Sequence, residues 1–377
     1  MAKKRQYNDL SEKKAAKIAA PKLVYQPPMP RRYNPPIGLI GCGGISSSHL
    51  AAYKQMGLNI VAMCDLIEER AESRRKEFFP DAQVYTDYKQ LLKRDDIEVV
   101  DIATHPQDRV YLIPAALKAR KHVLSQKPFV LDLNLGQKFA DLAEKMGVTL
   151  AVNQNGRWSP HWSWIRNAIA KGKVGDVQAV HMNCHWSHDW IATTPFNRVH
   201  HIVLYDYAIH WFDAMASFMP GNEAKIVMAN LSYARKQVAK PPLLGQAMIE
   251  FENGLGSLVF DGAVEFAKND NGFITGTKGT LQYDGPNISD HRVKMTTRRG
   301  MVEPELEGAW FRQGFMGSMG ELLCAIEKKC TPLNNPIDNL RGLAICFAAV
   351  VSAQTGKPQI VGKVRKAPLD TCMVADE

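Results

Sequence analysis

The sequence has no C-x-x-C pair among its cysteines. It contains seven cysteines, an odd number, scattered between residues 42 and 372. This pattern excludes a disulfide framework and a C-x-x-C metal or redox motif. We therefore expect reduced, mostly buried thiols and a cytoplasmic protein.

Long hydrophobic runs are missing as well. No stretch approaches the roughly 20 consecutive apolar residues that a membrane-spanning helix needs, so we predict no membrane partner. The segment RRYNPPIGLIG, residues 31–41, looks like a twin-arginine export signal. Its apolar part is short, however, and the first strand of a domain explains it better.

Excess charge is missing outside the first 35 residues. The formal net charge is +9, but residues 1–35 hold nine Lys and Arg against Asp9 and Glu12. The rest of the chain is close to neutral and shows no nucleic-acid motif, so we predict no nucleic-acid partner. We interpret residues 1–35 as a basic, Pro-rich arm, either exposed or clasping another subunit.

What the sequence does contain begins with a glycine turn. A chain of 377 residues is long enough for two domains. The stretch PPIGLIGCGGISSSHL reads as a buried strand, a turn at Gly41, Gly43 and Gly44, and a helix starting near Ile45 and Ser46. In G-x-G-x-x-G terms, Ser46 replaces the last glycine, and the helix N-terminus favours a phosphate.

The strand after this helix ends in Asp65, whose carboxylate can accept hydrogen bonds from both hydroxyls of an adenosine ribose. A 2′-phosphate would be repelled there, which favours NAD over NADP. Arg70, Arg74 and Arg75 follow on the next helix and keep NADP open. Asp65 can also be read as a helix N-cap.

Strands and helices then alternate up to residue 153. Strands at 97–104, 121–126 and 147–154, with helices at 107–120 and 134–146, predict a Rossmann doubly wound parallel sheet over residues 36–153. Ligands bind beyond the carboxyl ends of such strands. Thr104, His105, Gln126, Lys127 and Asn153 occupy these ends, so we predict that they contact the cofactor.

Residues 154–362 read as a second, α+β domain. After the amphipathic segment LYDYAIHWFDAMASFM come several strand-like runs without helices between them, which predicts a large, mostly antiparallel, open-faced sheet. Helical patterns return at 309–329 and 336–354. We expect a homo-dimer or homo-tetramer formed through this sheet, and a tail at 363–377.

Three motifs resemble the glucose-fructose oxidoreductase/inositol dehydrogenase/MocA (Gfo/Idh/MocA) family. They are GLIGCGGIS, SQKPFV with Gln126 in place of a glutamate, and DYAIHWFD as the Asp-x-x-x-His segment. The resemblance implies an NAD(P)-dependent oxidoreductase whose catalytic group is Lys127, Asp206 and His210. The sequence departs from the family where VHHIVLYDY, with His200, His201 and Ile202, replaces glycines.

The residue types fit that chemistry. Asp206 and His210 stand at i and i+4, hence on one helix face, where the carboxylate can orient the imidazole or bind a hydroxyl. His210 is expected to act as general base on a hydroxyl proton. Lys127 precedes a proline, which keeps the chain extended, and its ammonium can stabilise an alkoxide. The alternative is a surface Asp–His pair and a solvated lysine.

Five of the seven tryptophans fall between residues 158 and 190. Sugar rings stack on indoles, so this region predicts a polyhydroxylated substrate held by Arg157, Trp158, His185 and His201 in addition to the catalytic group. Packing at a domain interface is the competing explanation for each tryptophan.

The stretch HMNCHWSH offers metal ligands in His181, Cys184, His185 and His188. On a strand His181 and His185 share one face while Cys184 and His188 take the other, so convergence on one ion is awkward. We therefore predict no metal site.

Three functions remain open. The first is an NAD-dependent dehydrogenase acting on a secondary hydroxyl of a sugar, glycoside or cyclic polyol. The second keeps the fold but uses tightly bound NAD for transient oxidation at C3 and elimination, which cleaves a glycoside without net NADH. The third is an NAD-binding sensor without chemistry, which predicts a missing catalytic residue.

Overall fold

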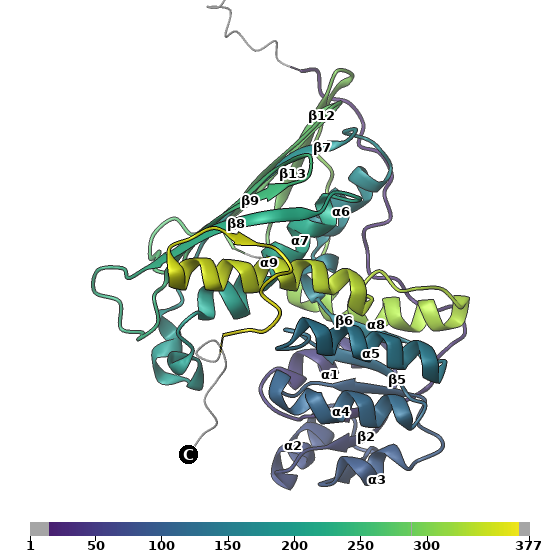
Figure 1. Ribbon diagram of the computed structural model, residues 1–377. Helices are drawn as coiled ribbons and strands as arrows, with labels where there is room; N and C mark the ends of the chain where they lie inside the picture. Colours follow the sequence, from purple (N-terminus) through teal and green to yellow (C-terminus); the bar gives the residue numbers. More distant parts are fainter. Residues whose placement is uncertain (1–14, 288, 369–377) are drawn as a thin grey trace, which may run out of the picture.

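We describe the protein from a computed structural model that covers residues 15–287 and 289–368 (Figure 1). Residues 1–14 of the expected arm, residue 288 and residues 369–377 of the expected tail lie outside the described residues. Two sheets of different character organise the chain, and the cavity described below lies where their domains meet.

The first sheet is parallel, with strand order β3-β2-β1-β4-β5-β6. The strands are β1 (Pro36–Ile40), β2 (Asn59–Cys64), β3 (Gln83–Tyr85), β4 (Val99–Ile102), β5 (His122–Gln126) and β6 (Leu150–Asn153). The helices between them are α1 (Ser46–Met56), α2 (Glu68–Phe78), α3 (Tyr88–Leu92), α4 (Pro106–Lys118) and α5 (Leu133–Met146). Strands β4 and β6 are buried along their whole length and are apolar except for Asp101 and Asn153, as expected for strands covered on both faces. The predicted doubly wound sheet is confirmed.

Helix α8 (Trp310–Lys328) packs in an unexpected place. From the sequence, this helix is expected in the second domain. In the structure, it lies against α1, β5 and β6 of the first domain. Phe315, Met319 and Leu322 share a hydrophobic cluster with Leu39 and Leu50. A parallel sheet needs cover on both faces, and α8 supplies part of that cover next to α1.

The second sheet has the strand order β14-β13-β12-β11-β7-β10-β9-β8-β15 among the described residues. Its strands are β7 (Val177–His185), β8 (Ala224–Ser232), β9 (Leu244–Phe251), β10 (Gly254–Asp261), β11 (Asn269–Gly276), β12 (Gly279–Gly285), β13 (Arg292–Thr297), β14 (Gly300–Val302) and β15 (Gln359–Ile360). All neighbours pair antiparallel except β7 and β10, so the mostly antiparallel sheet is confirmed.

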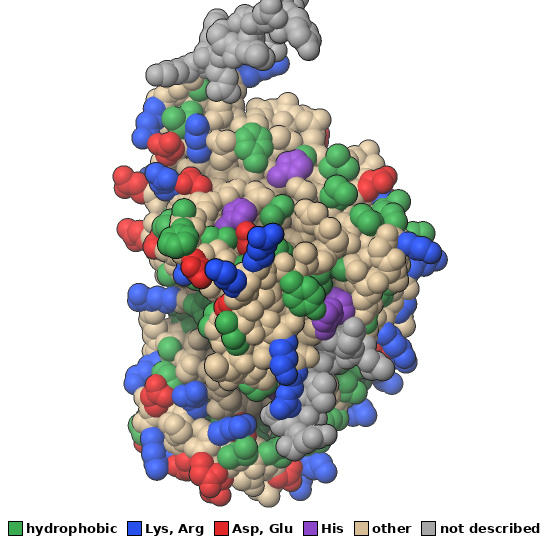
Figure 2. Space-filling model, turned by 90° about the vertical axis from the view of Figure 1, so that its left-hand side faces the viewer, with side chains coloured by type: hydrophobic (Ala, Val, Ile, Leu, Met, Phe, Trp, Pro, Cys, Tyr) green, Lys and Arg blue, Asp and Glu red, His purple; other side chains and the backbone are tan. Residues whose placement is uncertain are grey.

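One face of this sheet is covered by α6 (Pro160–Ala170), α7 (Ile209–Phe218) and α9 (Pro336–Thr355), as Figure 1 shows. The other face is open. Figure 2 views that side of the molecule, where apolar side chains lie among charged ones. Met248 and Leu255 on this face are 64% and 58% exposed, which is high for large apolar side chains.

Helix α9 is the one helix within the described residues that is long and apolar enough to cross a membrane by length and composition. About two thirds (67%) of its apolar window is buried inside the fold. It packs against α5, α7 and β8. Asp338 and Arg341 interrupt its apolar run and form an ion pair at 3.2 Å. Its environment is that of a core helix.

Both described ends of the chain cross between the domains. The arm pairs with the second sheet at Lys17 and Met301, then places the backbone N–H groups of Arg31 and Arg32 on the Glu327 carboxylate of α8. The run PIGLI that follows them is β1, a buried strand of the first sheet. At the other end, Ala367 donates to Leu131 O at 2.9 Å on the Rossmann side.

Candidate active site

A cavity of about 650 Å³ opens between the two domains. From the first domain it is lined by seven of the residues predicted to contact cofactor. From the second domain it is lined by Asp206 and His210, so all three predicted catalytic residues face one space. The seven residues of the first domain are Gly43, Gly44, Ile45, Thr104, His105, Gln126 and Lys127.

The glycine turn leaves open space next to its backbone. A Cβ added at Gly43 or Gly44 would meet nothing within 4 Å, while one at Gly41 would lie 2.8 Å from Thr104 Cγ2. Gly41 also has a φ of +95°, which side chains rarely adopt. Helix α1 begins here without a side-chain cap, and although Ser46 N and Ser48 N bond Gly43 O and Ile45 O, the positive end of the helix dipole faces the turn.

Asp65 fixes this turn from the end of β2. Its Oδ2 accepts from Cys42 N at 2.7 Å and its Oδ1 from Ile67 N at 3.0 Å. Arg74, rather than Arg70, reaches the turn, donating from Nε to Ser46 Oγ at 3.1 Å. Arg70 is exposed on α2 and does not line the cavity.

Lys127 and Asp206 form an ion pair in the cavity wall. Lys127 Nζ lies 3.1 Å from Asp206 Oδ1 and also donates to Asp206 O at 2.9 Å. Their side chains are 16% and 19% exposed, which leaves both accessible from the cavity. The spacing in the sequence predicts that the Asp206 carboxylate contacts the His210 imidazole. Among the described residues, its ion-pair partner is Lys127 instead.

The reason is a change in helix type. Residues Val203–Tyr207 form a π-helix, η4, in which Ala208 N bonds Val203 O, five residues back, at 2.8 Å. The α-helix α7 starts only at Ile209. The wider π-turn removes the i, i+4 stacking assumed for Asp206 and His210 and directs Asp206 toward Lys127.

The partner of His210 is Gln154, which follows β6. Gln154 Nε2 lies 3.2 Å from His210 Nδ1 and 3.3 Å from Ile209 O. Its Oε1 accepts from Asn339 Nδ2 at 3.3 Å. A carbonyl on one side and an amide donor on the other fix the orientation of the Gln154 amide, so its nitrogen faces the imidazole.

This contact decides where the proton of His210 lies. Since Gln154 donates to Nδ1, Nδ1 is the acceptor and the neutral ring carries its proton on Nε2. Burial, reinforced by the Lys127 ammonium, holds the pKa of His210 well below its usual range, so the ring is neutral. His210 in this state offers the Nε2–H as a hydrogen-bond donor, and its predicted role as general base stays a prediction.

Gln126 belongs to a buried network below the turn. Its Nε2 lies 2.9 Å from His49 Nε2, and its Oε1 accepts from Lys127 N at 2.7 Å. His49 Nδ1 lies 2.7 Å from Asp101 Oδ2, which also accepts from Tyr53. An amide can donate to His49 Nε2 and a carboxylate cannot, so the network suits glutamine at position 126.

Asn153 also belongs to this network and not to the cavity surface. It is fully buried, with Nδ2 lying 3.2 Å from His49 Nε2. Asn153 therefore supports His49 from below the cavity surface and does not stand where the predicted contact with the cofactor requires it.

Arg157 and Trp158, predicted to bind substrate, are in the interior. Arg157 makes a bidentate pair with Asp213 at 2.7 Å and a further contact with Asp338 at 2.7 Å. Trp158 is 2% exposed and packs on Gly317, where an added Cβ would lie 2.1 Å from its ring. Neither side chain lines the cavity, so their positions fit the alternative of packing and not the predicted contact with a substrate.

His185 and His201 are also outside the cavity lining. His185 lies on the open face of β7, 4.0 Å from Asp261. His201 is 2% exposed, within the core. Of the residues that replace the family's glycines, His201 and Ile202 are buried and His200 is exposed, and none of the three lines the cavity. The neighbouring Val199 does line it.

Most of the aromatic side chains that line the cavity were not predicted from the sequence. Trp186 and Trp190 were counted among the five clustered tryptophans, and both line the cavity; Trp162 and Trp164 do not. Tyr207, Phe260, Trp310 and Phe311 join them from distant segments. Only the fold brings these segments together, since no local pattern links residue 260 or 310 to the glycine turn.

The metal ligands suggested by HMNCHWSH do not converge. His181 lies on the open face of β7, bonded to Ser257 Oγ at 2.7 Å, while Cys184 and His188 line the cavity. Another group, His161, Asp270 and His291, has donor atoms within 4.8 Å of one another. Its imidazoles are stacked at 3.6 Å and 20°, however, so their in-plane lone pairs do not point at one ion.

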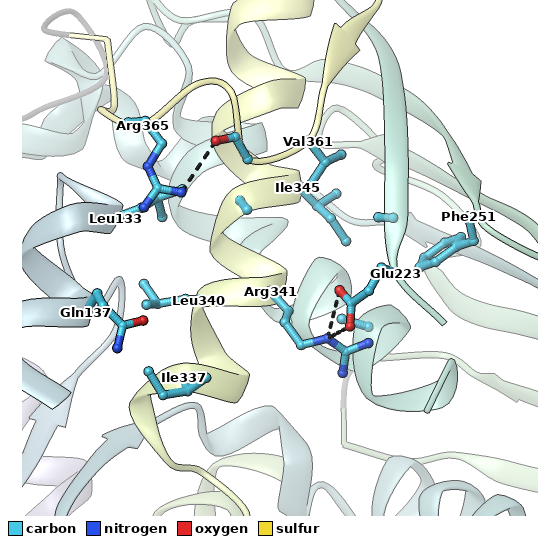
Figure 3. Close-up of a pocket in the computed structure, with 14 residues that line it drawn as sticks. Leu133, Gln137, Glu223, Phe251, Ile337, Leu340, Arg341, Ile345, Val361 and Arg365 are labelled. Atoms are coloured by element: carbon cyan, nitrogen blue, oxygen red, sulfur yellow. Dashed lines mark hydrogen bonds and ion pairs between the residues drawn. The ribbon is translucent and has the colours of Figure 1, made fainter. Parts of the chain in front are cut away.

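A second cavity, of about 370 Å³, lies between α5, α9 and β8 (Figure 3). Its charged side chains are already paired: Arg341 bonds Glu223, and Arg365 donates to Gly362 O. Apolar residues such as Leu340 and Ile345 make up much of the remaining wall. It offers no group of reactive side chains comparable with Lys127, Asp206 and His210.

Comparisons with known proteins agree on one group of relatives. The GFO_IDH_MocA oxidoreductase family, with an NAD-binding Rossmann fold, matches residues 36–154, and the GFO/IDH/MocA C-terminal domain matches residues 162–282. A D-apiose dehydrogenase of Paraburkholderia graminis is 26% identical over 340 residues, covering 85% of this chain and 88% of that protein. An inositol 2-dehydrogenase of Salmonella typhimurium is 28% identical over 181 residues, covering 47% and 52%.

Two solved structures share the fold. An oxidoreductase from Agrobacterium radiobacter, in complex with NAD+, L-tartaric acid and magnesium, superposes with a TM-score of 0.77 at 20% identity, covering 87% of this chain and 99% of that chain. A levoglucosan dehydrogenase in complex with NADH and levoglucosan gives 0.74 at 21% identity, covering 88% and 100%.

Proposed function

The chain belongs to the Gfo/Idh/MocA oxidoreductases, an NAD-binding Rossmann family whose members include sugar and polyol dehydrogenases, and on that premise we propose a specific reaction. The protein oxidises a secondary hydroxyl of a sugar, glycoside or cyclic polyol, with Lys127, Asp206 and His210 around the reacting carbon. The observation that supports this most is that these three side chains, from two domains, line one cavity with the glycine turn.

The residues present fit NAD. The open backbone at Gly43 and Gly44, with the uncapped start of α1, suits a pyrophosphate. Asp65, at the end of β2, suits the two ribose hydroxyls and disfavours a 2′-phosphate. Thr104, His105, Gln126 and Lys127 lie along the path to the second domain. When bound, the nicotinamide supplies a hydride acceptor.

The chain's own residues divide the remaining work. Lys127 Nζ and His210 Nε2–H both donate toward the cavity and hold the oxygen that becomes an alkoxide and then a carbonyl. Asp206 is the only carboxylate among the described residues that line the cavity. It accepts the hydroxyl proton, and its ion pair with the Lys127 ammonium at 3.1 Å holds the carboxylate beside the reacting oxygen.

The test is NADH formation by purified protein with a panel of sugars, glycosides and inositols. Lys127→Ala and Asp206→Asn should lose activity while still binding NAD, because neither residue belongs to the glycine turn. Arg70→Ala, on the exposed surface of α2, is the matched control. Unchanged activity in both site variants refutes the assignment.

A glycoside-cleaving reaction without net NADH is the second candidate. Tyr207 lines the cavity next to Asp206, and its hydroxyl is buried without a partner among the described residues. Such a group could act on a glycosidic oxygen after transient oxidation. Dialysed protein that cleaves a glycoside without added NAD supports this candidate, whereas a requirement for stoichiometric NAD supports the dehydrogenase. A sensor without chemistry predicts neither activity.

We also propose that copies associate through the open face of the second sheet. Met248 and Leu255 are large, exposed and on that face. Met248→Asp should lower the molar mass measured by light scattering if the face is an interface. The free state of the described cysteines supports a reducing, cytoplasmic location.

A further inference from the structure

One part of the cavity wall is aromatic. His188, Tyr207 and Phe260 form one continuous surface: the ring centroids of His188 lie 4.4 Å from Tyr207 and 5.3 Å from Phe260. Trp211 continues this surface, 5.4 Å from Phe260. All four side chains line the cavity, so a bound molecule meets ring faces and edges there.

His188 contributes a ring, not a charge. Burial lowers its pKa to about 4, so the imidazole is neutral at neutral pH. Cys184, which also lines the cavity, is a neutral thiol, because burial raises its pKa well above the usual range. Asn155 already accepts a hydrogen bond from Trp310 Nε1 at 2.8 Å.

Two polar atoms in this wall, Tyr207 Oη and His188 Nδ1, are buried without a partner among the described residues and can meet a hydroxyl. Lys127, Asp206 and His210 can hydrogen-bond one or two hydroxyls. A free cyclic polyol has a hydroxyl on every ring carbon, and those directed at the rings of Trp186, Trp190 or Phe196 would lose water without gaining a partner, at about 1–3 kcal/mol each. A small polyol alone is a poor match for this wall.

The outer part of the wall is built for a flat apolar group. Trp186, Trp190 and Phe196 all come from the short segment 186–196 after β7 and line the cavity. Trp190 is 55% exposed, an unusual cost for an indole unless a ligand covers it. Asp189 anchors this segment by accepting from Val238 N and Ala239 N, both at 2.9 Å.

We propose that the substrate is an aryl glycoside: a sugar held at Lys127, Asp206 and His210, joined to a planar aromatic group that stacks among Trp186, Trp190 and Phe196. This inference rests on the proposed oxidoreductase function and narrows its substrate class. The cavity of about 650 Å³ extends from the glycine turn to these three aromatic side chains, and pockets of this size accept drug-sized ligands.

The experiment compares phenyl and methyl glycosides of the same sugars. Gluco-, galacto-, manno- and xylo-configured pairs are titrated into the NAD-loaded Lys127→Ala protein by calorimetry, so that binding is measured without turnover. We expect the phenyl glycoside of the accepted sugar to bind about tenfold or more tightly than its methyl counterpart. Trp186→Leu and Trp190→Leu should bring the ratio of the two affinities toward one.

Tyr111→Leu is the control, because Tyr111 is an exposed aromatic on α4 that does not line the cavity. It should leave the ratio as in the parent protein. Equal affinity for phenyl and methyl glycosides, or tighter binding of free inositol than of every phenyl glycoside, overturns the inference. Wild-type protein that still forms NADH with a methyl glycoside or inositol would keep the proposed function while the aryl-glycoside inference fails.

Discussion

The hydrogen bond from Gln154 to His210 can be reversed by one substitution. In Gln154→Glu a carboxylate replaces the amide nitrogen that lies 3.2 Å from His210 Nδ1. An ionised carboxylate can only accept, so Nδ1 must then carry the proton and Nε2 presents a lone pair to the cavity. The variant therefore exchanges a donor for an acceptor at the reacting oxygen.

Two effects of known size follow. A carboxylate this close should raise the pKa of His210 by about one to three units, each worth about 1.4 kcal/mol. Losing one donor to a developing oxyanion should lower kcat/KM by about 10²–10³. In the wild type, burial and Lys127 keep the ring neutral, so His210 contributes no ionisation to the pH profile near neutrality.

The assay combines kinetics with spectroscopy. The kcat/KM for NADH formation is measured from mildly acidic to alkaline pH, and nitrogen-15 NMR of labelled histidine reports which ring nitrogen is protonated. We expect a new acidic limb in Gln154→Glu, because its imidazole gains a proton as the pH falls through the raised pKa. Gln154→Met, which removes the hydrogen bond without adding charge, should show no such limb. A wild-type spectrum with the proton on Nδ1 would refute the reasoning.

The remaining predictions concern the other assigned roles. Lys127→Ala should lower kcat by about 10²–10³ with little change in the NAD dissociation constant, because one donor to the alkoxide is lost; a calorimetric titration with NAD checks the second part. Asp65→Asn should weaken NAD binding and reduce discrimination against NADP, since the negative charge that repels a 2′-phosphate is removed; dissociation constants for both nucleotides decide this. Arg157→Ala should destabilise the fold by about 3–5 kcal/mol in urea unfolding by leaving the Asp213 carboxylate buried and unpaired, whereas unchanged stability with a raised KM would restore the substrate role. Stability should fall below about pH 6.5, by up to about 1.4 kcal/mol per unit for His161, because burial lowers its folded pKa and only the unfolded imidazole takes up the proton; His161→Gln should flatten that dependence.

The sequence predicted the architecture well because two kinds of local pattern specify it. Continuous apolar strands such as Pro36–Ile40 indicate a parallel sheet, and alternation such as that of Leu244–Phe251 indicates a sheet with one open face. The packing of helix α8 against α1, β5 and β6 could not be predicted, because periodicity shows which face of a helix is apolar and not which sheet it covers.

The site was predictable only where a motif marks it. The positions of Lys127, Asp206 and His210 could be read from the sequence, but their partners could not. The π-turn at Val203–Tyr207 moves Asp206 to Lys127, and Gln154 takes the place at His210. Arg157 was misread because an arginine beside tryptophans looks the same in sequence whether it meets a substrate or a buried carboxylate.

A crystal structure of the protein with NAD and an accepted glycoside tests the central claim most directly. We predict the adenosine ribose at Asp65, the nicotinamide against Lys127, and the reacting oxygen within about 2.6–3.2 Å of both Lys127 Nζ and His210 Nε2. A nicotinamide bound away from this group, or a substrate oxygen that contacts neither nitrogen, would contradict it.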